Sequence, residues 1–201
     1  QGGDTMKQPT PEQVKAFWAY MTGKHGSTVK DKASAVEMQA VAQLLQTMGI
    51  VDAEAFMTRF TTTLGMTIYT PFKIGVPTGG HTLWSQIETA AHEHQHIFQR
   101  KHVGVIEFTA QYLLDQAARG MFEAEAYRVS ATLSFWHTKK VPPVEAYGKV
   151  MESYGVGPDV IKFFMQYLTL SLPPIKQGAV PDEAAKVAIE WLEKNAGNLK
   201  A

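Results

Sequence analysis

The sequence predicts a mainly α-helical, α+β domain with one small β-sheet. Most segments place apolar residues at the helical period of three to four, whereas one short stretch, residues 66–70, alternates with period two. With 201 residues, 45% of them apolar, and no net formal charge, the chain is long enough to bury a core of its own. We therefore expect a single domain over residues 1–201.

The N-terminal third predicts three helices. Residues 11–21 follow Thr10 as N-cap and begin with a proline. Residues 32–48 form an amphipathic pattern that ends at Gly49, and residues 52–62 follow Asp52 as a cap.

Residues 66–70 predict a β-strand, which residues 72–76 could extend only as an edge or bulge because of Pro71. The turn at residues 77–80 then leads into a long helix over residues 81–101. Such an edge strand would either pair with an extended peptide or simply cap a helical core.

The C-terminal half predicts a series of helices separated by short loops, with Pro173, Pro174 and Gly178 in one of those loops. The expected helices cover residues 105–118, 122–136, 144–154, 159–170 and 182–195.

The most informative motif is His92-Glu93-His94-Gln95-His96, which reads H-E-x-x-H inside the helix over residues 81–101. Residues four apart share a helix face, so His92 and His96 can direct two imidazoles to one zinc ion, and Glu93 can reach a zinc-bound water as general base. Both histidines fall on the polar face of the helix. A solvated polar face is the alternative interpretation.

A third ligand is expected on the helix over residues 122–136. Glu125 falls on the apolar stripe of that helix, where a carboxylate is costly unless it is paired or metal-bound. Glu123 falls on the opposite face, with Ser130 and Ser134. The periodicity therefore favours Glu125, and the alternative for it is a buried ion pair to Arg119 or Arg128.

The other nearby histidines fit a metal site less well. His102 has the spacing of a longer H-E-x-x-H-x-x-G-x-x-H pattern, but Gln99 stands where glycine would turn the chain back to the metal. His94 points into the apolar stripe, so we expect it to be a hydrogen-bonded core histidine.

The combination of H-E-x-x-H with a downstream Glu-Ala pair at Glu125-Ala126 resembles gluzincin-type zinc metallopeptidases, and also small bacterial and phage-type predicted peptidases. The likeness covers residues 66–137. It implies a zincin-like fold, one Zn²⁺ per chain held by His92, His96 and Glu125, and Glu93 as the catalytic base. At the position four after the glutamate ligand, Val129 replaces the family's histidine-orienting aspartate, so Asp115 or Glu88 would take that role.

We therefore expect a zinc-dependent metalloendopeptidase acting on a peptide or protein substrate. The donor that stabilises the oxyanion remains open among Tyr127, Tyr154, Tyr112 and His137. The alternative is a metal-binding structural or interaction protein with a zincin-like fold and little turnover. Deformylase-like sites are excluded because the chain has no cysteine for a metal ligand.

The composition limits the classes of binding partner that we expect for this chain. The balanced charge gives no reason to expect nucleic acid, and no apolar run is long enough to span a bilayer. The start, Gln1–Thr5, lacks signal-peptide character, so we expect a soluble protein of undefined compartment and oligomeric state.

Overall fold

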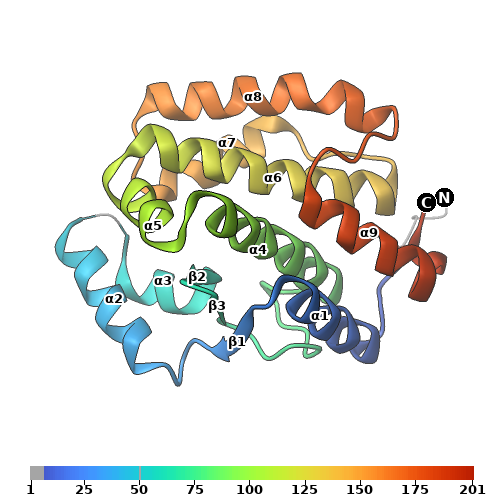
Figure 1. Ribbon diagram of the computed structural model, residues 1–201, viewed down its shortest axis with the longest axis horizontal. Helices are drawn as coiled ribbons and strands as arrows, with labels where there is room; N and C mark the ends of the chain where they lie inside the picture. Colours follow the sequence, from blue (N-terminus) through green and yellow to red (C-terminus); the bar gives the residue numbers. More distant parts are fainter. Residues whose placement is uncertain (1–6, 50) are drawn as a thin grey trace.

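A computed structural model describes residues 7–49 and 51–201 of the chain, and Gln1–Thr5 lie outside the described residues. The described part is mainly helical with one small three-stranded sheet, which confirms the predicted fold class (Figure 1). The elements are α1 (Pro11–His25), β1 (Thr28–Asp31), α2 (Val36–Thr47), α3 (Ala53–Arg59), β2 (Thr62–Leu64), β3 (Thr67–Thr70), α4 (Leu83–Val103), α5 (Val105–Leu114), α6 (Gln116–Thr138), α7 (Val144–Met151), η1 (Glu152–Tyr154), α8 (Pro158–Lys176), α9 (Glu183–Asn195) and η2 (Gly197–Leu199).

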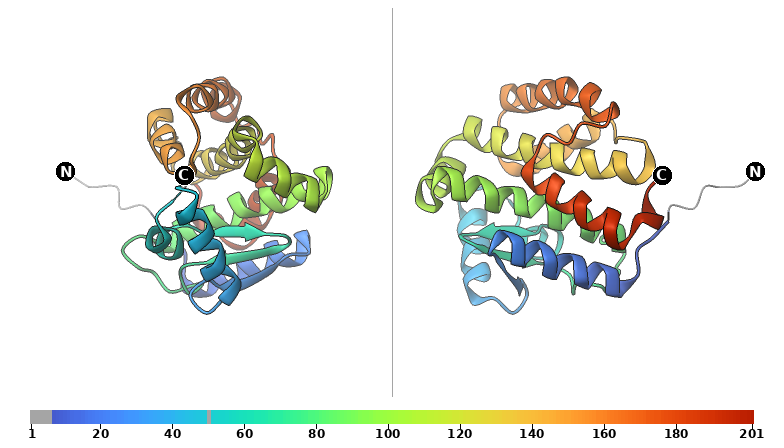
Figure 2. Two further views of the ribbon diagram at one scale, coloured as in Figure 1. Left: turned by 90° about the vertical axis from the view of Figure 1, so that its left-hand side faces the viewer. Right: turned by 45° about the vertical axis from the view of Figure 1, so that its right-hand side comes forward.

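Helix α4 is the centre of the arrangement. Helix α6 packs along it, α8 and α7 pack on the side of α6 away from α4, and α1 and α9 pack against α4 from another side (Figure 1). The sheet lies below α4, away from α8, with α2 and α3 beside it (Figure 2).

Three hydrophobic clusters hold these layers together. The largest joins α1, α4, α6 and α9 and includes Phe17, Trp18, Ile87 and Leu133. A second fills the space between α6, α7 and α8, and a third lies between α2, α3 and β3. Helix α6 contributes to the first two, so it is covered on more than one side.

Local hydrogen bonds fix the start of α4. The hydroxyl of Thr82 accepts from the backbone N–H of Ser85 at 3.1 Å, as an N-cap does. The Gln86 amide accepts from the N–H of Gly75 at 2.8 Å and donates to the carbonyl of Val76 at 2.9 Å. The loop before α4 is thereby tied to the helix itself.

The sheet has the order β1–β3–β2, with β1 parallel and β2 antiparallel to β3. The predicted strand is therefore central, not an edge, and the two edge strands are β1 and β2. Thr62, the first residue of β2, was expected to end the third helix, but that helix stops at Arg59. Thr61, Thr62 and Thr63 explain the stop, because consecutive β-branched side chains lose rotamer freedom in a helix.

Lys32 joins the sheet to α3. It was expected to begin the second helix, but its side chain is fully buried. Its ammonium donates to the carbonyls of Phe56 at 2.6 Å and Phe60 at 2.7 Å, and to the hydroxyl of Thr62 at 2.7 Å. All three ammonium protons therefore have an acceptor, and the segment leading into β2 is held in place.

Helix α8 is longer than expected. It continues through Pro173 and Pro174 to Lys176, although a loop was predicted there. Both prolines lie near the end of the helix, where the N–H groups of Gln177, Gly178 and Ala179 bond back to the last carbonyls. Among the described residues, no helix combines the length and apolar character needed to cross a bilayer.

Candidate metal centre

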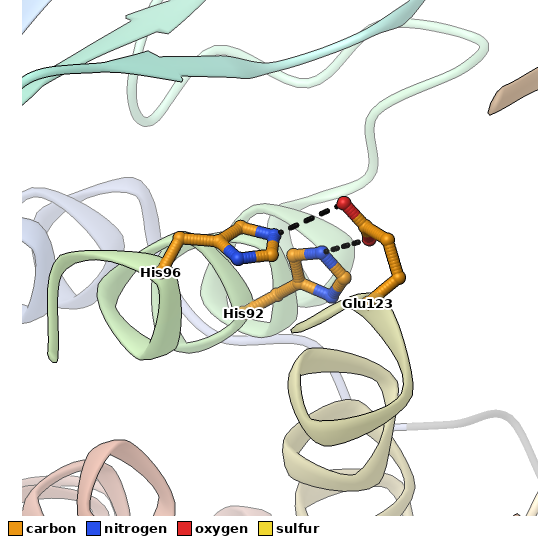
Figure 3. A group of neighbouring side chains, drawn as sticks. All are labelled: His92, His96 and Glu123. Atoms are coloured by element: carbon orange, nitrogen blue, oxygen red, sulfur yellow. Dashed lines mark ion pairs between the residues drawn. The ribbon is translucent and has the colours of Figure 1, made fainter. Parts of the chain in front are cut away.

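Three side chains from two helices converge in the cleft between α4 and α6. The Nε2 atom of His92 lies 3.5 Å from Glu123 Oε2, and the Nε2 atom of His96 lies 3.3 Å from Glu123 Oε1 (Figure 3). All three side chains are buried, and their ligand atoms lie within 4.8 Å of one another. Within residues 7–49 and 51–201, this is the one group of three such residues placed to share a metal ion.

The third member of the group is Glu123, whereas Glu125, the predicted ligand, lies outside it. Helix α6 begins at Asp115, whose carboxylate caps the N–H groups of Ala117 and Ala118. From that start, Glu123 and Ser130 fall on the face turned toward α4. That polar face meets the polar face of α4, with Glu123 buried between the helices and Ser130 half-buried.

Glu125 lies nearby and has a different contact. Its carboxylate accepts a hydrogen bond from the Gln99 amide nitrogen at 2.8 Å, and the same nitrogen donates to the carbonyl of Phe122 at 3.0 Å. Glu125 therefore holds Gln99 in position, and its carboxylate forms no ion pair with Arg119 or Arg128 within the described residues.

Gln99 in turn orients His96. Because the amide nitrogen of Gln99 faces two acceptors, its oxygen is the atom that faces His96 Nδ1, at 2.9 Å. An amide oxygen can only accept, so Nδ1 carries a proton in either protonation state, and the neutral ring would offer its Nε2 lone pair to a metal beside Glu123. This is the tautomer that a metal-binding histidine needs.

His92 is supported by Ser130, whose hydroxyl lies 3.3 Å from His92 Nδ1. The aspartate expected from the resemblance is thus replaced by a serine for one histidine and by a glutamine for the other. Neither Asp115 nor Glu88 takes this role in the structure, because Asp115 caps α6 and Glu88 hydrogen-bonds neither ring.

The electrostatics of the group favour an ionised carboxylate. Burial alone would raise the pKa of Glu123, but the imidazoles of His96 and His92 outweigh burial and hold this pKa far below its usual range. Burial would also lower the pKa of His96, yet the Glu123 carboxylate raises it. The two imidazoles therefore compensate the charge of the Glu123 carboxylate, and a metal cation bound by the group would take the place of their Nε2 protons.

The residues fit zinc. Imidazole nitrogen and carboxylate oxygen are zinc ligands, and two bonds of about 2.0–2.1 Å at a tetrahedral angle place ligand atoms roughly 3.3–3.4 Å apart. The two histidine–glutamate distances are 3.5 and 3.3 Å. Tyr112 donates to Glu123 Oε1 at 2.6 Å, while the buried Oε2 has no hydrogen-bond partner in the described part of the chain.

Glu93 lies where two hollows meet. Its carboxylate accepts from the Thr63 hydroxyl at 2.5 Å, so the edge strand β2 contacts the residue expected to be the base. An apolar cavity of about 190 Å³ and a wider groove of about 540 Å³ both border Glu93, and Phe60, Thr61, His92 and Tyr154 also line both.

The two hollows differ in lining. The apolar cavity is walled by α2, α3, β2 and α5, mainly through Val41, Leu45, Val51, Phe56, Phe60, Leu64 and Leu113. The hydroxyl groove runs between α4, α6 and α7, mainly along Ser85, Thr89, Tyr127, Ser130, Ser134, Thr138 and Tyr147.

The remaining histidines lie outside the group. His94 is fully buried, with Nδ1 donating to the carbonyl of Ala90 and Nε2 accepting from Ser27, which confirms the expected core histidine. His102 is exposed and bonds the carbonyl of Phe98. His137 is buried against Leu199 and lines neither hollow, so it is excluded as an oxyanion donor.

Sequence reasoning missed several residues at the site: Glu123, Ser130, Thr63, Arg100 and Arg119. For Glu123 and Ser130 a signal existed, since both fall on the polar face of their helix. Comparisons with protein-family models, with curated proteins and with solved structures find no match for this chain. The chemistry of the site is therefore the basis for assigning a function.

Proposed function

We propose that this chain is a zinc-dependent metalloendopeptidase that hydrolyses peptide bonds between the apolar cavity and the hydroxyl groove. The observation that carries the proposal is the convergence of His92, His96 and Glu123 beside Glu93, at the point where the two hollows meet. Zinc held by these three side chains would polarise a scissile carbonyl and lower the pKa of a water molecule.

The chain's own residues supply the proton transfers. Glu93 would take a proton from the attacking water and pass it to the leaving amine. Because the Thr63 hydroxyl donates to Oε2 of Glu93, this oxygen is held in place and Oε1 is left to receive the proton. A zinc site that serves structure alone needs no such carboxylate.

Tyr154 is the best donor for the developing oxyanion. It lines both hollows, whereas the Tyr112 hydroxyl is already committed to Glu123. Burial and the nearby Glu123 carboxylate raise the pKa of Tyr154 well above its usual value, so the phenol keeps its proton.

A peptide would lie extended beside β2. Residues 61–64 line the apolar cavity, and β2 pairs with β3 along one edge only within the described chain. Main-chain pairing with such an edge holds a substrate without reading its sequence.

The rival is a metal-binding structural protein with a blocked cleft. No residue on α8 or α9 lines either hollow, so these C-terminal helices do not fill the cleft in the described structure. This observation favours the enzyme.

The test combines metal content with activity. Protein purified without added zinc should carry about one zinc per chain by mass spectrometry, and the His92→Ala, His96→Ala double variant should carry none. Wild type should cleave members of a fluorescence-quenched peptide library, with the cleaved bonds identified by mass spectrometry.

The matched variant is Glu93→Gln, which should keep zinc and the fold and lose at least about 100-fold in kcat, the range of a lost general base. Zinc retained by the double variant, or equal cleavage by Glu93→Gln, would overturn the proposal. Zinc binding without cleavage of any library member would favour the structural rival.

A further inference from the structure

Arg100 is a buried cation in the wall of the apolar cavity. It lies on α4 one turn after His96, and its side chain is only 6% exposed. One nitrogen, Nη2, donates to the carbonyl of Thr63 at 2.6 Å, and the guanidinium lies 4.3 Å from the centre of the Phe108 ring. Its Nε and Nη1 atoms are shielded from solvent and have no partner among the described residues.

No carboxylate lies within ion-pair distance of Arg100 in the described part of the chain. Across residues 7–49 and 51–201, none of the ion pairs involves Arg100, although Glu93 and Glu123 are near enough to influence its pKa. Removing a guanidinium from water without pairing it costs several kcal/mol. An unpaired buried charge is therefore expected where its partner arrives from outside, with a ligand.

Arg119 shows how the same cavity treats an arginine that serves structure. It is equally buried, at 6%, and lines the same cavity. Its nitrogens donate to four main-chain carbonyls, those of Tyr112, Leu113, Tyr154 and Gly155, at 2.6–3.3 Å. The fold supplies hydrogen-bond acceptors to Arg119 but leaves two nitrogens of Arg100 without an acceptor among the described residues.

We propose that Arg100 binds a carboxylate of the peptide substrate inside the apolar cavity. An arginine fork matches the two oxygens of a carboxylate, and the apolar walls around it would hold the attached side chain or backbone. This inference rests on the proposed function for the substrate class, and it names the chemical feature that the enzyme selects.

The position of Arg100 sets where that carboxylate lies. Arg100 follows His96 by four residues of helix, a rise of about 6 Å, whereas an extended peptide advances about 3.3 Å per residue. The carboxylate therefore belongs to a residue within one or two positions of the scissile bond. An acidic side chain at this position fits the proposed endopeptidase, whereas a terminal carboxylate would make the enzyme a carboxypeptidase.

The experiment measures binding without turnover. N-acetyl-phenylalanine and its C-terminal amide are titrated into wild type by calorimetry, both as purified and after removal of metal. A second pair, the α-amides of N-acetyl-glutamate and N-acetyl-glutamine, tests the side-chain source. We expect about 10–100-fold tighter binding of the acid in one pair, the range of a charge-assisted hydrogen bond.

A preference in the first pair assigns a terminal carboxylate, and a preference in the second pair assigns an acidic side chain. Equal affinities in both pairs in wild type overturn the proposal, and this outcome needs no variant to fold. Arg100→Gln should remove the preference. Lys162→Gln, which removes an exposed positive charge on α8, away from both hollows, should leave it unchanged.

Thermal unfolding separates binding from structural support. Loss of an unpaired buried charge should leave the Tm of Arg100→Gln equal to or above that of wild type, whereas Arg119→Gln should lower it. A fall in Tm for Arg100→Gln as large as that for Arg119→Gln would make Arg100 a structural residue and contradict the proposal.

The two proposals can fail separately. Acid preference in a protein that holds no zinc would support the Arg100 site and contradict the metallopeptidase. Zinc-dependent cleavage with no preference for the acid would support the metallopeptidase and contradict the Arg100 site.

Discussion

The apolar cavity and the hydroxyl groove meet at His92 and Glu93 and yet are built differently. The cavity is enclosed by elements from the N-terminal third and by α5, with two buried arginines in its wall. The groove lies between helices of the middle of the chain and is lined largely by side chains with hydroxyl groups. The apolar cavity is suited to select a bound group by shape and charge, whereas the hydroxyl groove offers hydrogen bonds that many peptides would make. For the proposed peptidase, this difference predicts that substrate specificity lies on the cavity side of the cleaved bond.

The largest expected effect concerns Glu123, which lines the cavity and completes the candidate metal centre. Glu123→Ala should weaken zinc affinity beyond the roughly 10–100-fold expected for Glu125→Ala, which acts through Gln99. Competition with a zinc chelator measures both. Equal losses of zinc affinity in the two variants would contradict the assignment of Glu123 as a zinc ligand and of Glu125 as a residue that acts through Gln99.

The next effect concerns Lys32, which holds the β2 side of the cavity. Lys32→Met should lower the free energy of unfolding by roughly 2–4 kcal/mol, because it leaves two carbonyls and a hydroxyl without their donor. Hydrogen exchange should accelerate in residues 56–64 and remain unchanged in the groove. The exposed Lys30→Met is the control and should cost less than about 1 kcal/mol. An unchanged free energy of unfolding for Lys32→Met would show that Lys32 does not anchor the cavity wall.

Filling each hollow tests the difference in specificity directly. Leu45→Trp narrows the apolar cavity and should reduce kcat/KM roughly 10–100-fold for peptides with a large residue on that side of the cleaved bond. Ser134→Trp narrows the groove and should change preference only on the other side. Peptide-library profiles that shift identically in both variants would contradict the separation of the two walls.

The smallest effect is a pH dependence that belongs to the groove. Burial raises the pKa of Glu88 from its usual 4.5 to about 7. The folded protein thus binds this proton more tightly than the unfolded chain, so the stabilisation is complete below pH 4.5 and is lost as pH rises to about 7. Roughly 1–2 kcal/mol is expected, with some discount for its partly open surroundings. Denaturation of Glu88→Gln across this range should show a flatter profile, and an unchanged profile would exclude Glu88 as the cause.

The sequence predicted the helix that carries the motif because its signals are local. His92 and His96 are four residues apart, and the caps and the apolar stripe of that helix can be read from adjacent residues. The core position of His94 followed from the same periodicity, and burial and hydrogen bonding confirm it.

The identity of the third side chain could not be read in this way. Periodicity places Glu123 and Glu125 on different faces of α6 but does not tell which face meets α4. The prediction assumed that a polar face is solvated, and α6 is instead covered on several sides. Strand β2 was missed for a related reason, since three residues of an edge strand gain their structure from pairing with β3 and not from their own pattern.

The candidate ligands come from two different helices, α4 and α6, and this arrangement would couple metal binding to the stability of the protein. A metal bound by both α4 and α6 would be a cross-link between them, so folding and metal supply would be linked by mass action. Each tenfold rise in free zinc above the dissociation constant would add about 1.4 kcal/mol to the stability of the native state. In a zinc-poor compartment the native state would be less stable and a larger fraction of the chain would be exposed to degradation, so its abundance would follow the availability of the metal.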